Sequence, residues 1–379
     1  MITRALESAI TRDFPGKRAV IIYGARRVGK TTLIEQVLSG RDGVFYLDGD
    51  IPGNRKRLED VSTSKWRNIL GDNSILFIDE AQRIEDIGIK LKHITDHIPE
   101  VSIIASGSSS FDLANKINEP LTGRKWEFHL YPLSFQELVS YHGLNEEQEQ
   151  LPQRLVYGSY PEVVQNPNSA RRILETLTSD YLYKDILVWS GIRHSDKLDT
   201  LLKALALQIG SQVTYSELGQ LCELDKKTVE RYLGVLQQAF IIFRLPSFSR
   251  NLRNELKFSR KIYFHDNGIR NAILGSFTPF ELRTDVGKLW ENYLVSERIK
   301  LISNSESYAR SYFWRTTQQQ EVDYVEELND KVNAFEFKWN PLAKTKGLRT
   351  IKNAYSLENV PIITPDNYDD FLLGERYPV

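Results

Sequence analysis

The sequence predicts an α/β protein of several domains, with a parallel β-sheet at its N-terminal end. Short apolar runs alternate with helical stretches over about the first 140 residues, a pattern typical of a parallel sheet covered by helices. Three helical stretches followed by two short strands occupy residues 196–265, and a long helix followed by strands comes after residue 284. Because 379 residues exceed the usual size of one hydrophobic core, more than one domain is expected.

Five apolar runs in the N-terminal part predict the strands of the parallel sheet. Each run is short and largely apolar, as expected for strands that are buried on both faces. They are residues 19–23, 44–47, 74–78, 101–105 and 126–130. Helical periodicity appears between them at residues 32–38, around Trp66 and at residues 87–98, while residues 1–17 read as a polar lead-in.

The loop after the first strand carries the clearest functional signal. Residues 24–31 fit the phosphate-binding pattern G-x-x-x-x-G-K-[ST], between a predicted strand and a predicted helix. Glycines let the backbone approach a polyphosphate, and the N–H groups of such a loop point at it from the positive end of a helix. Lys30 is expected to reach the β- and γ-phosphates of ATP, and Thr31 to hold Mg²⁺. The predicted nucleotide-binding residues are Gly24, Ala25, Arg26, Arg27, Val28, Gly29, Lys30, Thr31, Thr32 and Ser108.

Two acidic residues end the third predicted strand, about 50 residues after the loop. A nucleotide hydrolase needs its second acidic site at this position. Asp79 is therefore expected to hold Mg²⁺, and Glu80 to orient and deprotonate the attacking water. An acidic strand end that simply starts a loop is the alternative, which the preceding phosphate-binding pattern disfavours.

Four further polar residues each allow two interpretations. Ser108, after the fourth strand, either senses the γ-phosphate or belongs to a simple turn. Arg124 either supplies charge to a phosphoryl transition state or forms a surface salt bridge. Arg26 and Arg27 lie inside the loop, where each either touches phosphate or points to solvent. The predicted catalytic residues are accordingly Glu80, Lys30 and Arg124.

The middle of the chain predicts a helical connector and then a winged helix-turn-helix. Residues 145–150 are acidic and glutamine-rich, which predicts a solvated loop, and residues 155–187 read as helical with a break at 158–161. The next helices are expected at residues 198–207, from the capping box at 214–217, and from residue 225, with strands at 240–245 and 261–264. Three helices with a strand pair after them are the order of a winged helix-turn-helix.

Basic residues gather in this predicted helix-turn-helix. The candidate groove residues are Lys226, Lys227, Thr228 and Arg231, and the candidate wing residues are Arg250, Arg253 and Lys257, with Arg260 and Lys261 close by. In a wing beside a recognition helix such residues would follow the phosphates of DNA. A solvated surface is the alternative, and the two interpretations stay open.

Acidic residues near the C-terminal end form a last candidate site. Asp323 lies on one predicted strand, and Glu336 and Lys338 lie on the next, where alternation sends both to the same face. With the upstream Glu291 they are expected to gather at one edge of the C-terminal sheet. Asp323 and Glu336 can hold Mg²⁺, and Lys338 can steady a water molecule or a phosphorane charge. A solvated sheet edge, where Lys338 neutralises Glu336, is the alternative.

The composition limits the classes of function. The formal net charge is −1, so nucleic acid would have to be bound by a local basic patch. The single cysteine, Cys222, excludes an internal disulfide framework and a cysteine-cluster zinc site. No apolar run is long enough for a membrane span, and no N-terminal stretch reads as a signal peptide, so a cytoplasmic location is expected.

Taken together, these motifs resemble the bacterial and archaeal AAA+-type ATPases that carry a conserved C-terminal domain of unknown function. The resemblance covers nearly the whole chain. Its motifs lie at residues 24–33, 77–82, 106–109, 121–124, 132–138, 158–161, 185–186, 287–292 and 321–324. The sequence departs from the usual family pattern at Lys184, where the family has Arg, and at Ser159, where it has Gly.

The resemblance implies four parts and a combined function. These are a P-loop AAA+-like ATPase domain at 1–140, a helical connector or lid at 141–195, a winged helix-turn-helix at 196–265, and a domain similar to PD-(D/E)xK nucleases at 266–379. We expect ATP and Mg²⁺ as cofactors, and DNA and a second copy of the chain as candidate partners. The expected function is Mg²⁺-dependent ATP hydrolysis coupled to a C-terminal half that binds DNA or a partner. The alternative is a slow ATP-driven signalling or defence switch whose C-terminal half is a protein-interaction scaffold.

Overall fold

The computed structural model describes residues 2–59, 62–108, 117, 120–179, 195–249, 260–345 and 347–379. It divides the chain into two compact units. Unit 1 consists of Met1–Pro132 with Gln238–Phe240, and unit 2 of Leu133–Gln237 with Ile241–Val379. The sequence predicted four parts, of which the last three fall within unit 2 except for Gln238–Phe240. That finer division remains a prediction.

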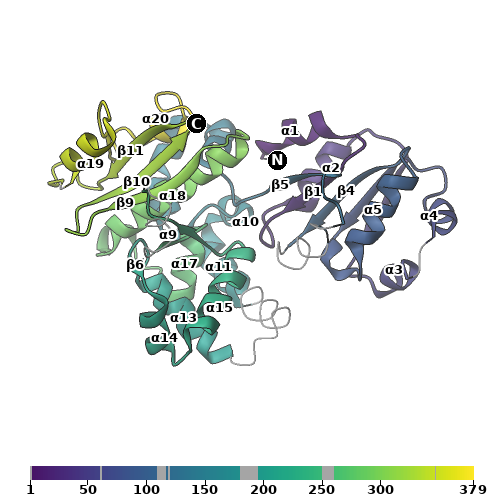
Figure 1. The fold of residues 1–379 in the computed structure, drawn as a ribbon, viewed down its shortest axis with the longest axis horizontal. Helices are drawn as coiled ribbons and strands as arrows, with labels where there is room; N and C mark the ends of the chain where they lie inside the picture. Colours follow the sequence, from purple (N-terminus) through teal and green to yellow (C-terminus); the bar gives the residue numbers. More distant parts are fainter. Residues whose placement is uncertain are drawn as a thin grey trace. The chain divides into compact units, whose positions relative to one another are not determined.

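Unit 1 is built on a five-stranded sheet in the order β2-β3-β4-β1-β5 (Figure 1). The strands are β1 Ala19–Tyr23, β2 Val44–Asp48, β3 Ile75–Asp79, β4 Ser102–Gly107 and β5 Lys125–His129. All four neighbouring pairs are parallel. Every residue of β1 and β3 is buried, because helices cover both faces of the sheet. The predicted parallel sheet is therefore confirmed, with each strand within about two residues of its predicted position.

The helices of unit 1 follow the apolar patterns of the sequence with two exceptions. They are α1 Leu6–Asp13, α2 Lys30–Leu38, α3 Pro52–Arg57, α4 Thr63–Leu70 and α5 Ile87–His97, with a short 3-10 helix at Ala81–Arg83. The core face of α2 consists of Leu33, Ile34, Val37 and Leu38. The first exception is α3, which has no buried residue. The second is α1, which lies in the predicted polar lead-in, because Leu6, Ala9 and Ile10 place three buried side chains on one helical face.

Unit 2 begins with a series of short helices. They are α7 Phe135–His142, α8 Leu144–Glu149, α9 Leu151–Tyr157, α10 Pro161–Gln165 and α11 Ala170–Leu177, with a 3-10 helix at Pro167–Ser169. The predicted break is present, since Gly158 ends α9 with a positive φ of 69° and Pro161 starts α10. The predicted loop at 145–150 was wrong, because α8 occupies it. The buried Glu147 of α8 is held there by a pair of hydrogen bonds from Arg154.

The next part of unit 2 contains three helices and a small antiparallel sheet. The helices are α13 Ser195–Leu207, α14 Tyr215–Cys222 and α15 Lys226–Gln238, and the strands are β6 Gln212–Val213, β7 Ile242–Leu245 and β8 Arg260–Phe264 in the order β6-β8-β7. Thr214 caps α14 by accepting a hydrogen bond from the backbone N–H of Glu217. The predicted helices and the predicted strand pair are present, and β6 is an addition that the sequence analysis missed.

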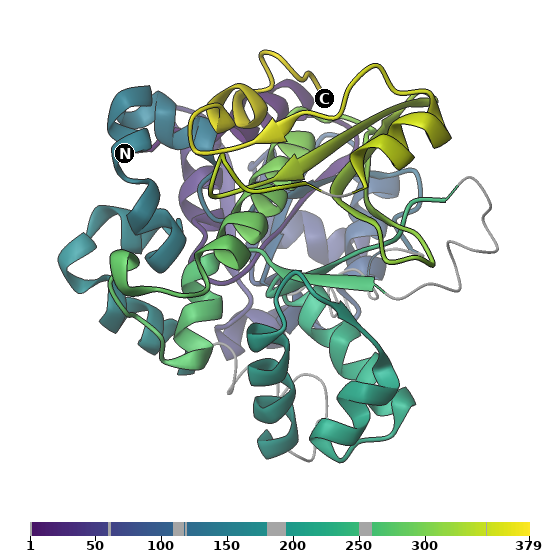
Figure 2. The same ribbon diagram turned by 90° about the vertical axis from the view of Figure 1, so that its left-hand side faces the viewer.

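The C-terminal part of unit 2 is a mixed sheet with a long helix beside it. Its helices are α17 Asn267–Leu274, α18 Val286–Asn304, α19 Leu348–Tyr355 and α20 Tyr368–Leu373, with a 3-10 helix at Phe280–Leu282. The sheet has the order β12-β11-β10-β9, from β9 Arg310–Arg315, β10 Glu321–Leu328, β11 Lys331–Phe337 and β12 Ile362–Ile363. Figure 2 shows α18 running beside β11, and the two elements share one apolar core around Leu294, Tyr324 and Phe335.

Candidate active site

The candidate active site of unit 1 lies at the carboxyl end of the parallel strands. The phosphate-binding loop follows β1, Asp79 is the last residue of β3, and Ser108 directly follows β4. Because these three strands are parallel and adjacent, their carboxyl ends meet at one edge of the sheet. In open α/β sheets this edge is the usual place for a ligand.

The backbone of the loop depends on its glycines and on a buried arginine. A Cβ atom at Gly24 would overlap the carbonyl of Leu130, and Gly29 has a φ of 94°, a value that favours glycine. The guanidinium of Arg4 donates from Nη1 to the carbonyl of Val28 at 2.6 Å and from Nη2 to the carbonyl of Tyr131 at 2.7 Å. Since a trans peptide points its carbonyl and N–H in opposite directions, the N–H of Gly29 is turned away from Arg4. The sequence analysis gave no signal for Arg4.

Lys30 is folded over the loop that precedes it. Its Nζ donates hydrogen bonds to the carbonyls of Gly24 at 3.0 Å and Ala25 at 2.9 Å, and the residue is only 6% exposed. Burial lowers the pKa of the ammonium, while the charges of Glu80 and Asp79 oppose this shift. The loop therefore holds a cationic side chain where an anionic phosphate is expected.

Thr31 and Asp79 place two oxygen ligands side by side. Thr31 Oγ1 donates to Asp79 Oδ2 at 2.7 Å, and Asp79 Oδ1 accepts from the hydroxyl of Ser106 and, at 3.0 Å, from the N–H of Glu80. Hydroxyl and carboxylate oxygens are the ligands that Mg²⁺ prefers. Among the described residues, no group of three or more His, Cys, Asp or Glu side chains could hold a metal ion by itself. This arrangement fits Mg²⁺ that takes its other ligands from phosphate and water, as it usually does.

Glu80 is held in place by two buried polar residues. Its backbone is left-handed, with a φ of 47°, and its Oε2 accepts a hydrogen bond from Ser108 Oγ at 3.0 Å. Gln82 Nε2 contacts the same Oε2 and also donates to Ser108 Oγ at 2.9 Å. Ser108 thus contacts the candidate base, and its predicted role as a γ-phosphate sensor remains a prediction. No role was predicted for Gln82, whereas Ser106 belongs to the polar stretch that was predicted to sense the γ-phosphate or to form a simple turn.

The predicted arginines lie in different places. Arg26 and Arg27 are in the loop, where Arg26 is half-buried and near enough to lower the pKa of Lys30, and Arg27 is exposed. Arg124 precedes β5 and so lies at the amino end of the sheet, opposite the phosphate-binding loop. Its Nε forms an ion pair with Asp96 at 2.6 Å, which is the salt-bridge interpretation of the sequence. This placement leaves only an action on a neighbouring copy of the chain for the catalytic interpretation of Arg124.

In unit 2, the structure brings together the four residues of the nuclease-like prediction. Lys338 Nζ lies 2.6 Å from Glu336 Oε1 and 3.9 Å from Asp323 Oδ2. Asp323 Oδ2 also accepts a hydrogen bond from the N–H of Phe337 at 2.9 Å. Glu291, on α18, contributes to the electrostatic environment of both carboxylates. The cluster therefore unites α18, β10 and the end of β11.

Three residues that were not predicted for this cluster complete it. Lys261 of β8 lies 2.9 Å from Glu291 Oε1, 2.6 Å from Glu321 Oε1 and 3.9 Å from Asp323 Oδ1. The sequence analysis placed Lys261 among the basic residues of a wing, but its side chain is buried. Strand alternation explains this, since Lys261 and Tyr263 share a face of β8 and both contact Glu291.

Two acids of this cluster, Asp323 and Glu336, have raised pKa values. Burial raises the pKa of Asp323 to about 8, with the charges of Glu291 and Glu336 adding to the effect and those of Lys261 and Lys338 opposing it. Burial also raises the pKa of Glu336, against the influence of Lys338. Among the described residues, Glu336 Oε2 is buried without a hydrogen-bond partner. Asp323 and Glu336 are therefore largely buried and not solvated, while Lys338 does pair with Glu336 as the alternative expected.

The candidate DNA-binding residues are only partly described. Lys226, Lys227 and Arg231 are exposed on α15, and the guanidinium of Arg231 lies 5.4 Å from the ring centre of Tyr232. Arg250, Arg253 and Lys257 lie outside the described residues. The exposed face of α15 agrees with the groove-binding prediction but does not test it.

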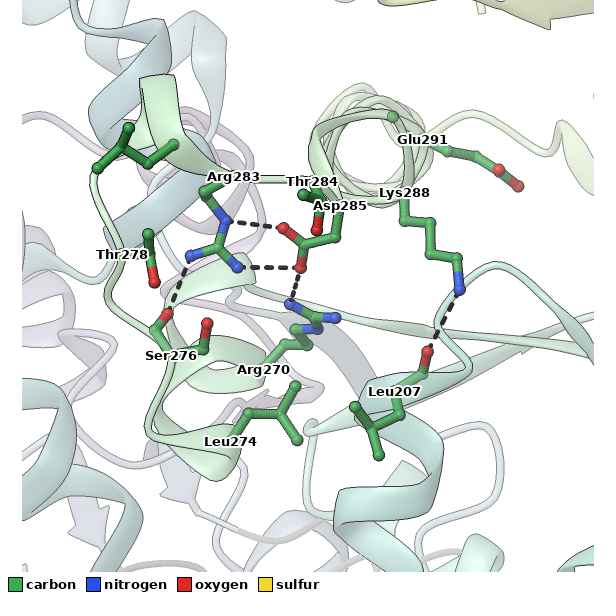
Figure 3. Close-up of a pocket in the computed structure, with 12 residues that line it drawn as sticks. Leu207, Arg270, Leu274, Ser276, Thr278, Arg283, Thr284, Asp285, Lys288 and Glu291 are labelled. Carbon is green, nitrogen blue, oxygen red and sulfur yellow. Dashed lines mark hydrogen bonds and ion pairs between the residues drawn. The ribbon is translucent and has the colours of Figure 1, made fainter.

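A cavity of about 800 Å³ lies beside the first turn of α18 (Figure 3). Arg270 and Arg283 share the carboxylate of Asp285 on its wall, at 2.6 Å and 2.8 Å. Lys288 Nζ lies 3.4 Å from the carbonyl of Leu207 at the rim. Glu291 also lines the cavity, but Figure 3 shows its side chain turned away from these groups, so its carboxylate belongs to the Lys261 cluster.

Within the part of the chain that the structure describes, no helix is both long and apolar enough to cross a membrane.

Three family models match successive parts of the chain. An AAA domain matches residues 16–139, a domain of unknown function (DUF8612) matches residues 148–279, and another (DUF4143) matches residues 286–373. The first match contains the phosphate-binding loop together with Asp79 and Glu80. The last contains Glu291, Asp323, Glu336 and Lys338, for which it names no activity.

Similar proteins occur in bacteria and archaea. A relative from Mycobacterium tuberculosis is 26% identical over 326 residues, covering 84% of this chain and 70% of its own length. A relative from Haemophilus influenzae is 24% identical and covers 94% of this chain and 89% of its own length. Both are described as uncharacterized proteins.

One solved structure shares the fold over most of its length. It is the Walker-type ATPase of Pyrococcus abyssi, with a TM-score of 0.50 and 16% sequence identity, covering 72% of this chain and 96% of that chain. At this identity the similarity shows a common fold and nothing finer.

Proposed function

Since residues 16–139 belong to the P-loop ATPases of the AAA type, we propose that the protein binds and hydrolyses ATP with Mg²⁺. One observation carries the proposal, the hydrogen bond between Thr31 and Asp79 at 2.7 Å. It joins the two side chains that a nucleotide-bound Mg²⁺ requires, beside a lysine that can contact phosphate. Thr31 lies in the first turn of α2 and Asp79 is the last residue of β3, so the hydrogen bond joins two elements at the carboxyl edge of the sheet.

The residues of the site have separable tasks in this proposal. Lys30 would exchange the carbonyls of Gly24 and Ala25 for phosphate oxygens, and the loop N–H groups would bind the same anion. Thr31 and Asp79 would hold Mg²⁺, which neutralises charge that develops on the phosphates. Glu80 would accept a proton from the attacking water, while its hydrogen bond from Ser108 keeps the carboxylate in a fixed orientation.

Nucleotide titration with phosphate-release kinetics tests this proposal. Wild-type protein should bind a fluorescent ATP analogue in the presence of Mg²⁺ and release phosphate from ATP. Lys30→Ala should lose tight binding because it lacks the charge that reaches the phosphates. The matched control is Lys92→Ala, since Lys92 is an exposed lysine of α5. Equal affinity in wild type and Lys30→Ala would refute the phosphate-binding role of the loop.

We further propose that unit 2 links the nucleotide state to DNA or to a protein partner. The exposed Lys226, Lys227 and Arg231 on α15 support a DNA partner, because phosphate contacts need accessible cations. The second candidate is a slow ATP-driven switch whose unit 2 is a protein scaffold. The ion pairs within the carboxylate cluster favour this candidate, since they hold its acids in a static arrangement. ATPase rates with linear duplex, branched and single-stranded DNA distinguish the two, because only the first candidate requires stimulation.

A further inference from the structure

The resemblance to nuclease-like folds implies a divalent metal ion at Asp323 and Glu336, and the residues present do not fit it well. Without a bound phosphate to supply the remaining ligands, a divalent metal ion at this place needs several free oxygen ligands from the protein that converge on one point. Within the described part of the chain, no group of three or more candidate ligand side chains does so. The carboxylates converge instead on two ammonium groups, those of Lys261 and Lys338.

Lys261 occupies the centre of the cluster. Its Nζ has carboxylate oxygens at 2.6 Å from Glu321 and 2.9 Å from Glu291, and the residue is only 1% exposed. The ring of Phe313 lies 5.6 Å from the same nitrogen, so an aromatic face covers a further side. A charge that is this desolvated persists only when it is paired.

The cluster needs no metal ion to balance its charge. Four carboxylates, those of Glu291, Glu321, Asp323 and Glu336, are in contact with ammonium groups. Arg315 adds a third cation, since its Nη1 lies 3.3 Å from Glu321 Oε2. Three cations against four carboxylates leave little net charge to attract a divalent ion.

We infer that Lys261 is the built-in cation of this cluster and excludes a divalent metal ion from it. The inference goes beyond the proposed ATPase function and concerns unit 2 alone. Lys261 comes from β8, whereas its partners come from α18 and β10. The cluster therefore joins the small antiparallel sheet β6-β8-β7 to the C-terminal sheet and holds the two together. It is a structural ion-pair cluster, although it is built from carboxylates of the kind that bind metal ions in other proteins.

Titration with Mn²⁺, followed by electron paramagnetic resonance, tests the inference. Wild-type protein should not bind Mn²⁺ in unit 2 with a dissociation constant below about 1 mM, the weak end of protein sites for divalent cations. The background for this experiment is Asp79→Asn, so that binding at the candidate ATP site does not contribute. On this background, Lys261→Met should gain one Mn²⁺ site, because the carboxylates lose their internal cation while the stem of the side chain is kept.

A control variant and a second substitution show whether the new Mn²⁺ site is specific to the loss of Lys261. Lys288→Met also removes a lysine of unit 2, but Lys288 contacts only the carbonyl of Leu207 at 3.4 Å among its described contacts, so no site should appear. Adding Asp323→Asn to Lys261→Met should remove the new site. If Lys261→Met fails to fold, the double variant Lys261→Met with Glu321→Gln carries the same expectation with one fewer unpaired carboxylate.

Two results would overturn the inference. The first is a wild-type unit 2 that binds Mn²⁺ tightly and loses it on Asp323→Asn, because the metal would then displace Lys261. Nicking of DNA by the wild-type protein with Mg²⁺ or Mn²⁺, abolished by Asp323→Ala with Lys338→Ala, would have the same meaning. The second is a folded Lys261→Met variant, single or double, without any gained site.

Discussion

Gln82 Nε2 lies 2.9 Å from Ser108 Oγ, and this contact connects the residues that follow β3 and β4. Both side chains are buried, and both contact Oε2 of Glu80. The candidate base is therefore held on one oxygen by two neighbours. A carboxylate that is oriented through one oxygen presents the other to a water molecule, which is the arrangement that general-base catalysis requires.

The first prediction separates ATP binding from hydrolysis. Glu80→Gln keeps the size of the side chain and loses the base, so turnover should fall by about 100-fold or more. Affinity for the ATP analogue should stay near that of the wild type, because Lys30 and Thr31 are unchanged. Phosphate release measured at saturating ATP checks the first expectation, and equilibrium titration checks the second. Wild-type turnover in this variant would exclude Glu80 as the base.

The second prediction concerns Gln82 as a positioning residue. Gln82→Ala removes a buried contact of Glu80, so kcat should fall by about 10- to 100-fold, the scale of small misplacements, while KM changes little. Gln82→Glu places a like charge beside Glu80 and should move the acid limb of the pH–rate profile to higher pH. A purely structural role would instead lower stability in both variants and leave the pH profile unchanged, and this outcome would rule the positioning role out.

The sheet and the loop were predictable because both are local in sequence. A strand that is buried on both faces must be apolar along its whole length, as β1 and β3 are. The loop pattern likewise places Lys30 and Thr31 within one turn. The contacts made by Asp79 and Glu80 also follow from strand order, since parallel strands bring their carboxyl ends together.

The incorrect predictions have a different physical origin, because they depend on side-chain pairs that form only when separate elements pack together. The acidic composition of residues 145–150 suggests a solvated loop, yet Arg154 and His142 pair with Glu147 and allow it to be buried. Lys261 looks like one more basic residue until strand β8 is placed beside Glu291. Composition cannot reveal such pairing, since it emerges only when the elements have packed.

The third prediction concerns the place where Arg124 acts. Its position at the amino end of β5 leaves catalysis only across a contact between two copies of the chain. Turnover per protomer should then rise with protein concentration, and Arg124→Ala should flatten that rise. Arg67→Ala is the control, because Arg67 is another exposed arginine of unit 1 that forms an ion pair, with Glu100. Turnover independent of concentration in the wild type would leave Arg124 with its ion pair to Asp96 alone.

The fourth prediction concerns α15. Replacing Lys226, Lys227 and Arg231 with Glu should weaken binding to any duplex and lower the salt dependence of that binding, because phosphate contacts release counterions without reading sequence. Fluorescence anisotropy at several salt concentrations measures both quantities. Lys197, Lys203 and Lys288 offer a triple-Glu control elsewhere in unit 2. An unchanged affinity and salt slope would assign the face of α15 to solvent or to a protein partner.

The fifth prediction concerns the pH dependence of stability in unit 1. His129, at the end of β5, packs its ring against Tyr23 at 5.6 Å and Phe240 at 5.7 Å between ring centres. Burial lowers the pKa of His129, and the charge of Glu127 opposes the shift only in part. The imidazole of His129 therefore binds a proton less readily in the folded unit than in the unfolded chain, where a histidine has a pKa of about 6.5.

The sign of the effect follows from that difference. Above about pH 6.5 the imidazole is neutral in both states and stability is complete, whereas below it the unfolded chain takes up the proton first and stability is lost. His129→Phe keeps an aromatic ring between Tyr23 and Phe240 and cannot be protonated, so the loss between about pH 6.5 and 5 should become smaller. Urea unfolding of both proteins at a series of pH values measures it. His97→Phe is the control, because it changes an exposed histidine of unit 1. His142→Phe is unsuitable, because His142 lies in unit 2 and pairs with Glu147. Identical pH slopes for wild type and His129→Phe would show that His129 does not contribute to the acid sensitivity of unit 1.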